Sequence, residues 1–595
     1  MYSRSFGFFC LAALLLSVVT GCKKSADTST GPPRSANAPQ SQAQSAPLPG
    51  LIARVHWLGI NRLSGETNAA YFMTIWKLSE TAQLEAQTLD KLASAIMSRA
   101  QPAGTKRPGV EKRLPDTNSE PRGAISANDT TNPLRSLLQD LLDEESYLEI
   151  RAETNQPGEL ALAIRLRADH ALLWQTNLAT ALESLTGTRP TLSSGQTSGW
   201  HLDLATGGNQ FANTNAHPQL SPQPLAFSLQ PFHGWTLLGL STGTNSTLAD
   251  LQSRIARTGS PFEPSPTNFW LDGQAQLPRV AQAFALKWKL PDNCPKVTMT
   301  ILGDGQDVRT HGQLHFPRPL PLELEPWNIP TNLVHDPLIG FTALRGFRPW
   351  LDAFKPWKDL NAGTTPNQAY IWDQEGLPAQ QYCAAPLAQA SNLVLRLSER
   401  LQQVANPWLQ AERIGQLQKS TNCDGVVWSG APFVSPQLRS TSDAQGQFVI
   451  ASLIPLTRTN LPPPPELLGE ISSRTNLLYY DWEITGQGLD HWLYLAQLWR
   501  FLTHHAQLPT DSASFAWFKA IAPKLRNCVT VLSTNAPNQL DFTRKSSLGF
   551  DSIELHLLTD WLESPKFPSG LHTFLAPPTP STPAIAETNS TPKIR

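Results

Sequence analysis

Charged side chains are scarce in this sequence, and neither sign dominates. Only 16% of the 595 residues are Asp, Glu, Lys or Arg, and 47 basic residues nearly balance 48 acidic ones, for a net charge of −1. Globular proteins usually carry about 25% charged residues. Because binding to nucleic acid depends on clustered basic side chains that contact phosphates, this composition argues against a nucleic-acid partner.

Signatures of catalysis and of cofactor binding are missing as well. The chain contains none of the motifs G-x-x-x-x-G-K-[ST], G-x-G-x-x-G, H-E-x-x-H and G-x-S-x-G, and it has no Cys-x-x-Cys pair. Such motifs hold nucleotide phosphates, zinc ions or an activated serine. We therefore expect no cofactor and no metal site, and the sequence favours a protein that is not an enzyme.

An apolar stretch over residues 6–19 follows a short N-terminal segment with one basic residue, Arg4. This pattern is typical of a secretory signal peptide, and the stretch is too short for a stable transmembrane helix. No second apolar stretch of spanning length follows. The sequence therefore predicts export, with residues 1–21 as a signal peptide.

The apolar stretch ends in Val19-Thr20-Gly21-Cys22. This tetrapeptide resembles the lipobox of bacterial lipoproteins, and the resemblance implies a diacylglyceryl group on the Cys22 thiol, cleavage before Cys22 and acylation of the new amino group. Several acyl chains on one residue anchor a protein stably in a membrane. We therefore expect a lipid-anchored, extracytoplasmic protein of the bacterial cell envelope. Because Lys23 rather than Asp follows the cysteine, the outer membrane is favoured. The alternative is an ordinary signal peptide with a chance cysteine.

Few cysteines remain for the body of the protein. Cys10 leaves with the signal peptide and Cys22 carries the lipid, so that an even number stays in an oxidising compartment: Cys294, Cys383, Cys423 and Cys528. Two disulfide bonds in any of three connectivities are consistent with this number. The alternative is four reduced, buried thiols.

Three polar segments contain almost no large apolar side chains. Residues 22–50 and 576–595 cannot bury enough surface to fold, so we expect a disordered tether behind the lipidated cysteine and a disordered Pro/Thr-rich tail. Residues 101–132 are expected to form a long polar loop.

Between these segments, strand patterns are interleaved with helical patterns. Residues 159–167 alternate apolar and polar side chains, and residues 172–185 have helical spacing. Val297–Leu302 and Val308–Phe316 flank Gly303-Asp304-Gly305, which is typical of a β-hairpin. Hairpins mixed with helices favour an α+β fold, with antiparallel sheets and helices packed on one face.

A faint internal repeat links two segments of the body. Pro, Leu, Asn, Gly and Trp residues recur in the same order over residues 321–351 and 465–493. The repeat predicts two related halves, a first α+β domain over residues 51–358 and a second over residues 359–575. This organisation loosely resembles uncharacterised extracytoplasmic proteins built from repeated α+β units.

The expected strand over residues 477–484 places two carboxylates side by side. Tyr479, Asp481 and Glu483 point to one face of such a strand, and neighbouring carboxylates can raise the pKa of one of them, as a general acid requires. Asp481-Trp482-Glu483 resembles the end of the family-18 chitinase signature, which implies Glu483 as the acid and Asp481 as its helper. The sequence departs from that signature at Tyr479 and Asn476, and it does not predict the family's β/α barrel. The alternative is a strand with one polar and one aromatic face.

Tryptophan is frequent, with 18 residues. Two pairs lie in expected helices at a spacing of seven, which places both members on one helix face: Trp350 with Trp357, and Trp492 with Trp499. Exposed tryptophans stack on sugars or cap apolar ligands, so these four are candidates to face a ligand. The alternative is core packing against the sheet.

Taken together, these features favour a non-enzymatic binding or scaffolding protein of the cell envelope. Its partners would be the membrane, reached through the lipid anchor, and an apolar ligand or an envelope protein. The alternative function is an envelope hydrolase that acts on glycan or peptide.

Overall fold

A computed structural model describes residues 48–100, 132–153, 157–192, 200–204, 225–242, 245–262, 269–284, 286, 288, 290–361, 363–376, 380–421, 424–431, 433–456, 461–502, 512–564 and 567–568. The expected signal peptide, the lipidated Cys22 and the C-terminal tail lie outside these residues, as do almost all of the tether and of the long polar loop.

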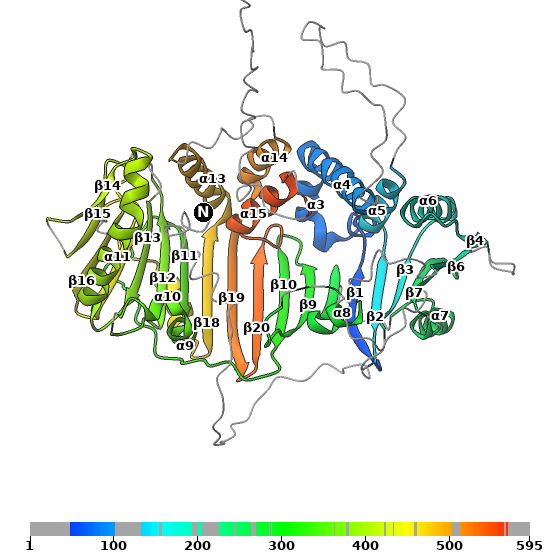
Figure 1. Ribbon diagram of the computed structural model, residues 1–595, viewed down its shortest axis with the longest axis horizontal. Helices are drawn as coiled ribbons and strands as arrows, with labels where there is room; N and C mark the ends of the chain where they lie inside the picture. The colour runs from blue at the N-terminus through cyan, green and yellow to red at the C-terminus, as the bar shows by residue number, and fades with distance from the viewer. Residues whose placement is uncertain are drawn as a thin grey trace, which may run out of the picture.

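Within the described residues, twenty strands form one continuous sheet, and all of their pairings are antiparallel (Figure 1). One group of ten strands comes first in the chain: β1 (Leu51–Trp57), β2 (Ser146–Arg151), β3 (Glu159–Ile164), β4 (Thr191–Leu192), β5 (Trp200–Leu204), β6 (Leu225–Phe232), β7 (Trp235–Ser241), β8 (Leu271–Gln276), β9 (Lys296–Gly303) and β10 (Val308–His315). The other ten follow: β11 (Leu338–Arg345), β12 (Gln368–Gln374), β13 (Gln380–Pro386), β14 (Gln416–Lys419), β15 (Gly425–Ser429), β16 (Gln437–Asp443), β17 (Gly446–Ser452), β18 (Leu477–Ile484), β19 (Asn527–Ala536) and β20 (Gln539–Ser546).

The two groups pair their strands in the same pattern. In the first, the order across the sheet is β4-β5-β6-β7-β3-β2-β1-β8-β9-β10. In the second it is β14-β15-β16-β17-β13-β12-β11-β18-β19-β20. The groups meet where β10 pairs with β20, with Val308 opposite Ser546 and His315 opposite Gln539. The expected α+β class is therefore confirmed.

The pairing differs from the repeat that the sequence suggests. That repeat aligns the segment before β11 with the segment before β18. In the sheet, however, β11 and β18 are neighbours within one group, with Gly340 opposite Glu483. In the matching order of the two groups, β11 corresponds to β1, and β18 corresponds to β8.

Helices lie around this sheet, and their bounds in chain order are α2 (Ile60–Leu63), α3 (Ala70–Trp76), α4 (Ser79–Ala100), α5 (Pro133–Asp143), α6 (Ala168–Thr186), α7 (Ser246–Thr258), α8 (Leu277–Ala283), α9 (Arg348–Ala353), α10 (Lys355–Lys358), α11 (Ala390–Ala411), α12 (Pro465–Ser472), α13 (Thr485–Leu502), α14 (Ala513–Ile521) and α15 (Ser552–Glu563). None of the described helices is long and apolar enough to cross a membrane.

Helices cover both faces of the sheet, so the expectation of helices on one face is not confirmed. In the first group, Ala161 and Ala163 of β3 pack in the cluster that contains α7, whereas Leu162 and Ile164 pack in the cluster that contains α6. Successive residues of a strand point to opposite faces, so α6 and α7 enclose β3 between them.

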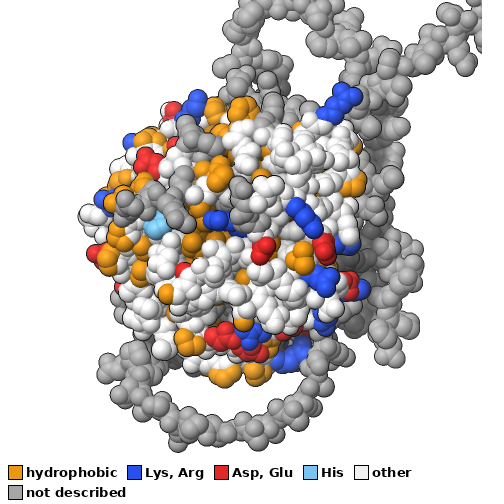
Figure 2. Space-filling view, turned by 90° about the vertical axis from the view of Figure 1, so that its left-hand side faces the viewer, with side chains coloured by type: hydrophobic (Ala, Val, Ile, Leu, Met, Phe, Trp, Pro, Cys, Tyr) orange, Lys and Arg blue, Asp and Glu red, His pale blue; other side chains and the backbone are white. Residues whose placement is uncertain are grey.

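The second group repeats this arrangement. Val449 of β17 packs with α11, while Phe448 and Ile450 face the cluster that contains α12 and Val334. Figure 2 looks onto this end of the molecule, where hydrophobic side chains reach the surface among polar and charged ones. A sheet buried on both faces has little surface for charged side chains, which agrees with the low charged fraction of 16%.

Helices from the two ends of the chain meet over the middle of the sheet. Leu84 of α4 and Ile75 of α3 share a core cluster with Trp517 of α14 and Leu555 of α15. The Trp517 indole also donates a hydrogen bond to the Thr81 hydroxyl of α4 at 3.0 Å. The N-terminal and C-terminal thirds of the chain therefore share one core.

Candidate functional site

A cavity with a volume of about 690 Å³ lies where three segments of the second group converge. They are the stretch before β11, the start of α9 with the loop into β12, and the turn after β13. The lining residues are Glu325, Pro326, Asn328, Arg348, Thr364, Thr365, Asn367, Gln368, Pro386, Leu387 and Ala388. A smaller cavity of about 440 Å³ shares Asn328 with it.

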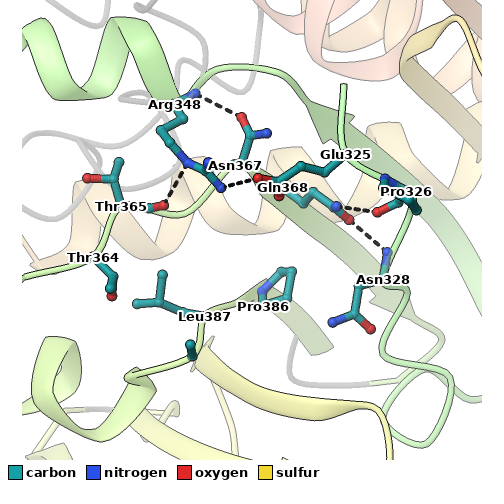
Figure 3. A pocket seen from close by; sticks show the side chains of 11 residues that line it. Glu325, Pro326, Asn328, Arg348, Thr364, Thr365, Asn367, Gln368, Pro386 and Leu387 are labelled. Carbon is teal, nitrogen blue, oxygen red and sulfur yellow. Dashed lines mark hydrogen bonds and ion pairs between the residues drawn. The ribbon is translucent and has the colours of Figure 1, made fainter. Parts of the chain in front are cut away.

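Arg348 supplies the cation of this pocket (Figure 3). It is the first residue of α9, and its backbone N–H donates to Asn367 Oδ1 at 3.1 Å. Its guanidinium donates to Glu325 Oε1 at 2.5 Å, to Glu323 Oε2 at 3.2 Å and to the Thr365 carbonyl at 3.3 Å. Because each of its three nitrogens donates to a different acceptor, the planar guanidinium is oriented before any ligand arrives.

Asn367 and Gln368 form a fixed polar wall, and both are almost fully buried. Asn367 Nδ2 donates to the Glu323 carbonyl at 2.7 Å, and Gln368 Nε2 donates to the Pro326 carbonyl at 2.6 Å. Gln368 Oε1 accepts from the Asn328 backbone N–H at 2.8 Å. These bonds bind the stretch before β11 to the start of β12, as Figure 3 shows.

Arg345 also holds the stretch before β11 in place, through contacts with Glu325 and Trp327. Its guanidinium lies 4.5 Å from the centre of the Trp327 ring and donates to the carbonyls of Glu325, Thr475 and Leu477 at 2.6–2.7 Å. Burial lowers the pKa of Arg345 from its usual value. Cation–π contact and carbonyl acceptors replace the carboxylate that a buried arginine usually has.

Thr364 leaves one polar atom of the pocket without a partner. Its Oγ1 is shielded from solvent, and no hydrogen bond to it is found among the described residues. Buried hydroxyls are normally satisfied, so an exception that lines a cavity marks a place where a ligand group can bond. With Arg348, two amides and the apolar edge of Leu387, the pocket suits a polar ligand with hydroxyl or amide groups.

The two carboxylates singled out from the sequence, Asp481 and Glu483, lie elsewhere, on the face of β18 that α15 covers. Asp481 accepts a hydrogen bond from the Thr342 hydroxyl at 2.6 Å. Glu483 accepts from the Ser552 backbone N–H at 2.7 Å and from its hydroxyl at 2.5 Å. Glu483 thus holds the N-terminus of α15 on the sheet, where the helix dipole favours an anion.

The pKa values of both carboxylates are raised. The sequence predicted such a shift from their mutual repulsion, and burial is its larger cause. Burial, reinforced by the charge of Glu483, raises the pKa of Asp481 well above its usual value. Burial also raises the pKa of Glu483, although the bonds from Ser552 oppose it. Neither residue lines either of the described cavities. The sheet is open rather than a β/α barrel, so the resemblance to the chitinase signature does not extend to the fold.

Two further carboxylates and a histidine extend this cluster. Burial raises the pKa of Asp373 to about 7, and burial together with the charge of Glu554 raises the pKa of Asp551 to about 7. His491 of α13 points its Nε2 at Asp373 Oδ1 across 4.0 Å, and burial lowers the pKa of His491 to about 4. No group of three or more potential metal ligands occurs in the part of the chain that the structure describes.

The tryptophans expected to face a ligand do not line the described cavities. Trp350 lies in α9 and Trp357 in α10. Phe354, in an extended conformation, separates the two helices, so the pair does not share one helix face as predicted. Both pack against Phe347 and its neighbours. Trp492 is half-buried in α13, and the side chain of Trp499 lies outside the described residues.

For the cysteines, the sequence left disulfide bonds and reduced thiols open, and the described residues show reduced thiols. Cys294, Cys383 and Cys528 are free thiols, and Cys423 lies outside the described residues. Burial raises the pKa of Cys383 to about 12, so this thiol is unreactive at neutral pH.

Sequence reasoning did not find the pocket residues. Arg348, Asn367 and Gln368 belong to no recognisable motif, and the two amides are adjacent to each other but nineteen and twenty residues beyond the arginine. A buried Asn-Gln pair directly before an aromatic strand was the one available signal, since such amides need partners.

Comparison with known proteins does not identify the chain, because no protein-family model, no curated protein and no solved structure matches it.

Proposed function

We propose that this protein is a lipid-anchored, extracytoplasmic binding protein without catalytic activity, and that its ligand site is the pocket around Arg348. The lipobox-like Val19-Thr20-Gly21-Cys22 supports the anchor. The unpartnered Thr364 hydroxyl in a preformed polar wall supports the site. The one carboxylate of the lining, Glu325, forms an ion pair with Arg348, which favours a binding role over general-base catalysis.

The ligand that fits this lining is a polar molecule rich in hydroxyl or amide groups, such as a fragment of envelope glycan. The guanidinium of Arg348 and the partly exposed amide of Asn328 can bond such groups, and the Leu387 edge accepts an apolar sugar face. A polar ligand fits the lining better than the apolar ligand that the sequence suggested.

Binding of soluble envelope polysaccharide fragments, measured by titration calorimetry, tests the site. Thr364→Val removes a hydroxyl that has no described partner, so it should leave stability unchanged but weaken binding about tenfold, the effect of one lost hydrogen bond in a buried site. Arg348→Gln should weaken binding further. Arg396→Gln, an exposed arginine of α11, is the matched control. Equal affinity for the Thr364→Val and unmodified proteins would refute the site.

The anchor has its own test. Metabolic labelling with a fatty-acid analogue should mark the chain, and Cys22→Ser should remove both the label and the protein's recovery in the membrane fraction. A labelled Cys22→Ser chain would contradict lipidation at this residue.

The alternative function is a hydrolase with Glu483 as the general acid, and the raised pKa of Glu483 favours it. In that case Glu483→Gln would abolish turnover of glycan or peptide substrates. A binding protein would lose only the contact between Glu483 and α15.

We further infer that the two groups of ten strands arose by duplication of one ten-stranded unit. Their identical pairing order supports this, and we infer a boundary between β10 and β11 rather than near residue 358, because β11 pairs within the second group. A superposition that left corresponding strands of the two groups unmatched would contradict duplication.

A further inference from the structure

The second cavity, of about 440 Å³, adjoins the first at Asn328, which lines both. The Asn328 backbone N–H donates to the Gln368 side chain of the first cavity at 2.8 Å (Figure 3). On its other side, the Asn328 side-chain amide lies 3.5 Å from the backbone carbonyl of Gln445, a residue of the second cavity. Asn328 therefore lies on the border between two neighbouring cavities.

Trp327 leaves one polar atom of the second cavity without a partner. Its indole Nε1 is shielded from solvent, and no hydrogen bond from it is found among the described residues. The ring itself is held in place, with the Arg345 guanidinium 4.5 Å from its centre and the centre of the Tyr370 ring 6.1 Å away. Because a buried indole N–H normally finds an acceptor, an exception that lines a cavity indicates a place where a ligand oxygen can bond.

The rest of the second lining combines apolar surface with neutral polar groups. Ile329 and Leu468 are apolar, whereas Thr331, Gln445 and Ser472 carry hydroxyl or amide groups. Gln445 Nε2 donates to the Thr331 hydroxyl at 2.9 Å, which orders this polar side. None of the described residues that line this cavity is charged. Such a lining suits an uncharged sugar unit, which has an apolar face and hydroxyl groups around it.

The positions of the unpartnered atoms bear on the length of the ligand. Each cavity has a volume within the range of about 300–1,000 Å³ that is usual for a site that holds one small molecule. Thr364 Oγ1 is the unpartnered atom of the first lining, and Trp327 Nε1 is that of the second. A small ligand in the first cavity would bond only the first of these atoms. A chain of sugar units that passes Asn328 would bond both.

We propose that the two cavities are neighbouring subsites for one uncharged oligosaccharide. One part of the chain lies on Arg348 and Thr364, and a further sugar unit accepts the hydrogen bond of the Trp327 indole. The proposal rests on the proposed function, because it takes the first cavity as the ligand site. It adds that the protein recognises a chain of several units rather than a single sugar.

Titration calorimetry with β-1,4-linked oligomers of N-acetylglucosamine, from the disaccharide to the hexasaccharide, tests this dependence on length. The affinity should rise with chain length until the second cavity is occupied. Trp327→Phe keeps an aromatic ring beside Arg345 but lacks the N–H. It should therefore lower the affinity for the hexasaccharide about tenfold more than the affinity for the disaccharide, the effect of one lost hydrogen bond. Thr364→Val should lower both affinities by the same factor.

The matched control is Trp288→Phe, because Trp288 is 50% exposed and lines neither cavity. This variant should bind every oligomer as tightly as the unmodified protein. A second variant does not disturb the core: Ser472→Phe, at an exposed position at the end of α12, should narrow the second cavity and remove the gain in affinity with length.

Equal affinities of the unmodified protein for the disaccharide and the hexasaccharide would overturn the proposal. So would a loss of affinity in Trp327→Phe that is the same at both lengths. Either result would leave the first cavity as a site for a short ligand, and the proposed function would stand. Absence of binding at every length would instead refute the glycan ligand of the proposed function, and this inference with it.

Discussion

In the first group of strands, the buried carboxylates Glu145 and Glu149 each pair with two or more cationic side chains. In the second group, a single arginine pairs with more than one carboxylate. Glu145 accepts from His56 at 3.0 Å, from Arg62 at 3.1 Å and from Arg165 at 3.2 Å. Glu149, which is fully buried, contacts two further arginines, Arg151 and Arg254. In the second group, Arg544 contacts Glu554, and it contacts Asp551 at 3.3 Å.

The balance of partners, rather than burial alone, decides the acidity of these groups. Burial alone would raise the pKa of Glu145, but the hydrogen bond from His56 and the charge of Arg62 outweigh it and lower the pKa. Asp481 has no arginine bonded to it, so burial and the charge of Glu483 raise its pKa. The same fold therefore contains buried carboxylates whose pKa values are lowered and others whose pKa values are raised, and the two kinds change the stability in opposite directions as the pH changes.

The largest expected effect is the loss of Arg544. Burial lowers the pKa of this guanidinium, but the hydrogen bonds that it donates to Glu554 raise the pKa overall, so it stays charged. Arg544→Met leaves the carboxylates of the cluster without their cation and should lower the free energy of unfolding by about 3–5 kcal/mol. Chemical denaturation measures this loss. Lys355→Met, which removes an exposed cation paired with the exposed Asp359, is the control and should cost less than about 1 kcal/mol.

Glu145→Gln is expected to have the next largest effect. The pKa of Glu145 is lowered by folding, so its stabilisation is present above its unfolded pKa and is lost as the pH falls through the folded value. The substitution should destabilise the protein by about 2 kcal/mol at pH 7, and the difference should shrink below pH 4.5. Glu144→Gln, which affects only an exposed bond to Asn61, serves as the control. A difference independent of pH would contradict the assignment.

Asp373→Asn should have an effect of similar size and of the opposite sign. Burial raises the pKa of Asp373 from 3.8 to about 7, so the folded protein binds more protons than the unfolded one, and this residue makes stability fall as the pH rises between those values. The amide removes the buried charge and should stabilise the protein at pH 8 by on the order of 2 kcal/mol.

His491 acts against Asp373 over part of that range. Its pKa falls from 6.5 to about 4 on folding, so it makes stability rise with pH between those values. We therefore expect the free energy of unfolding, measured by denaturation from pH 4 to pH 8, to rise more steeply with pH in Asp373→Asn than in the parent between pH 4 and pH 6.5. Asp359→Asn, an exposed carboxylate on α10's flank, should leave the pH profile unchanged. A destabilised Asp373→Asn protein at pH 8 would show that the carboxylate has a cation partner.

Local elements were predictable because their causes are local. The hairpin expected around Gly303-Asp304-Gly305 is β9 and β10, and the strand expected over residues 477–484 is β18. Side chains alternate on β18 as predicted, with Tyr480 and Trp482 on the aromatic core face and Asp481 and Glu483 opposite. The α7 helix begins at the Asn245 cap and ends at Gly259, a residue with φ of 74°.

The pocket could not be predicted, because its residues are brought together by pairing between distant strands. Arg348, Gln368 and Leu387 follow three different elements, and only the order of β11, β12 and β13 makes them neighbours. Hydrogen bonds from the Asn367 and Gln368 amides to the backbone carbonyls of Glu323 and Pro326 then fix this side of the pocket. Such bonds leave no spacing pattern in the sequence.

The sequence by itself determined the α+β class, the hairpins and the alternation of side chains on β18, because turn residues, caps and alternation act within a few residues. Only the tertiary structure decided that β10 pairs with β20 and that helices cover both faces of the sheet. It also decided that the pKa of Glu145 is lowered while that of Asp481 is raised. These outcomes depend on which distant groups share a buried environment, and burial strengthens every charge interaction within it.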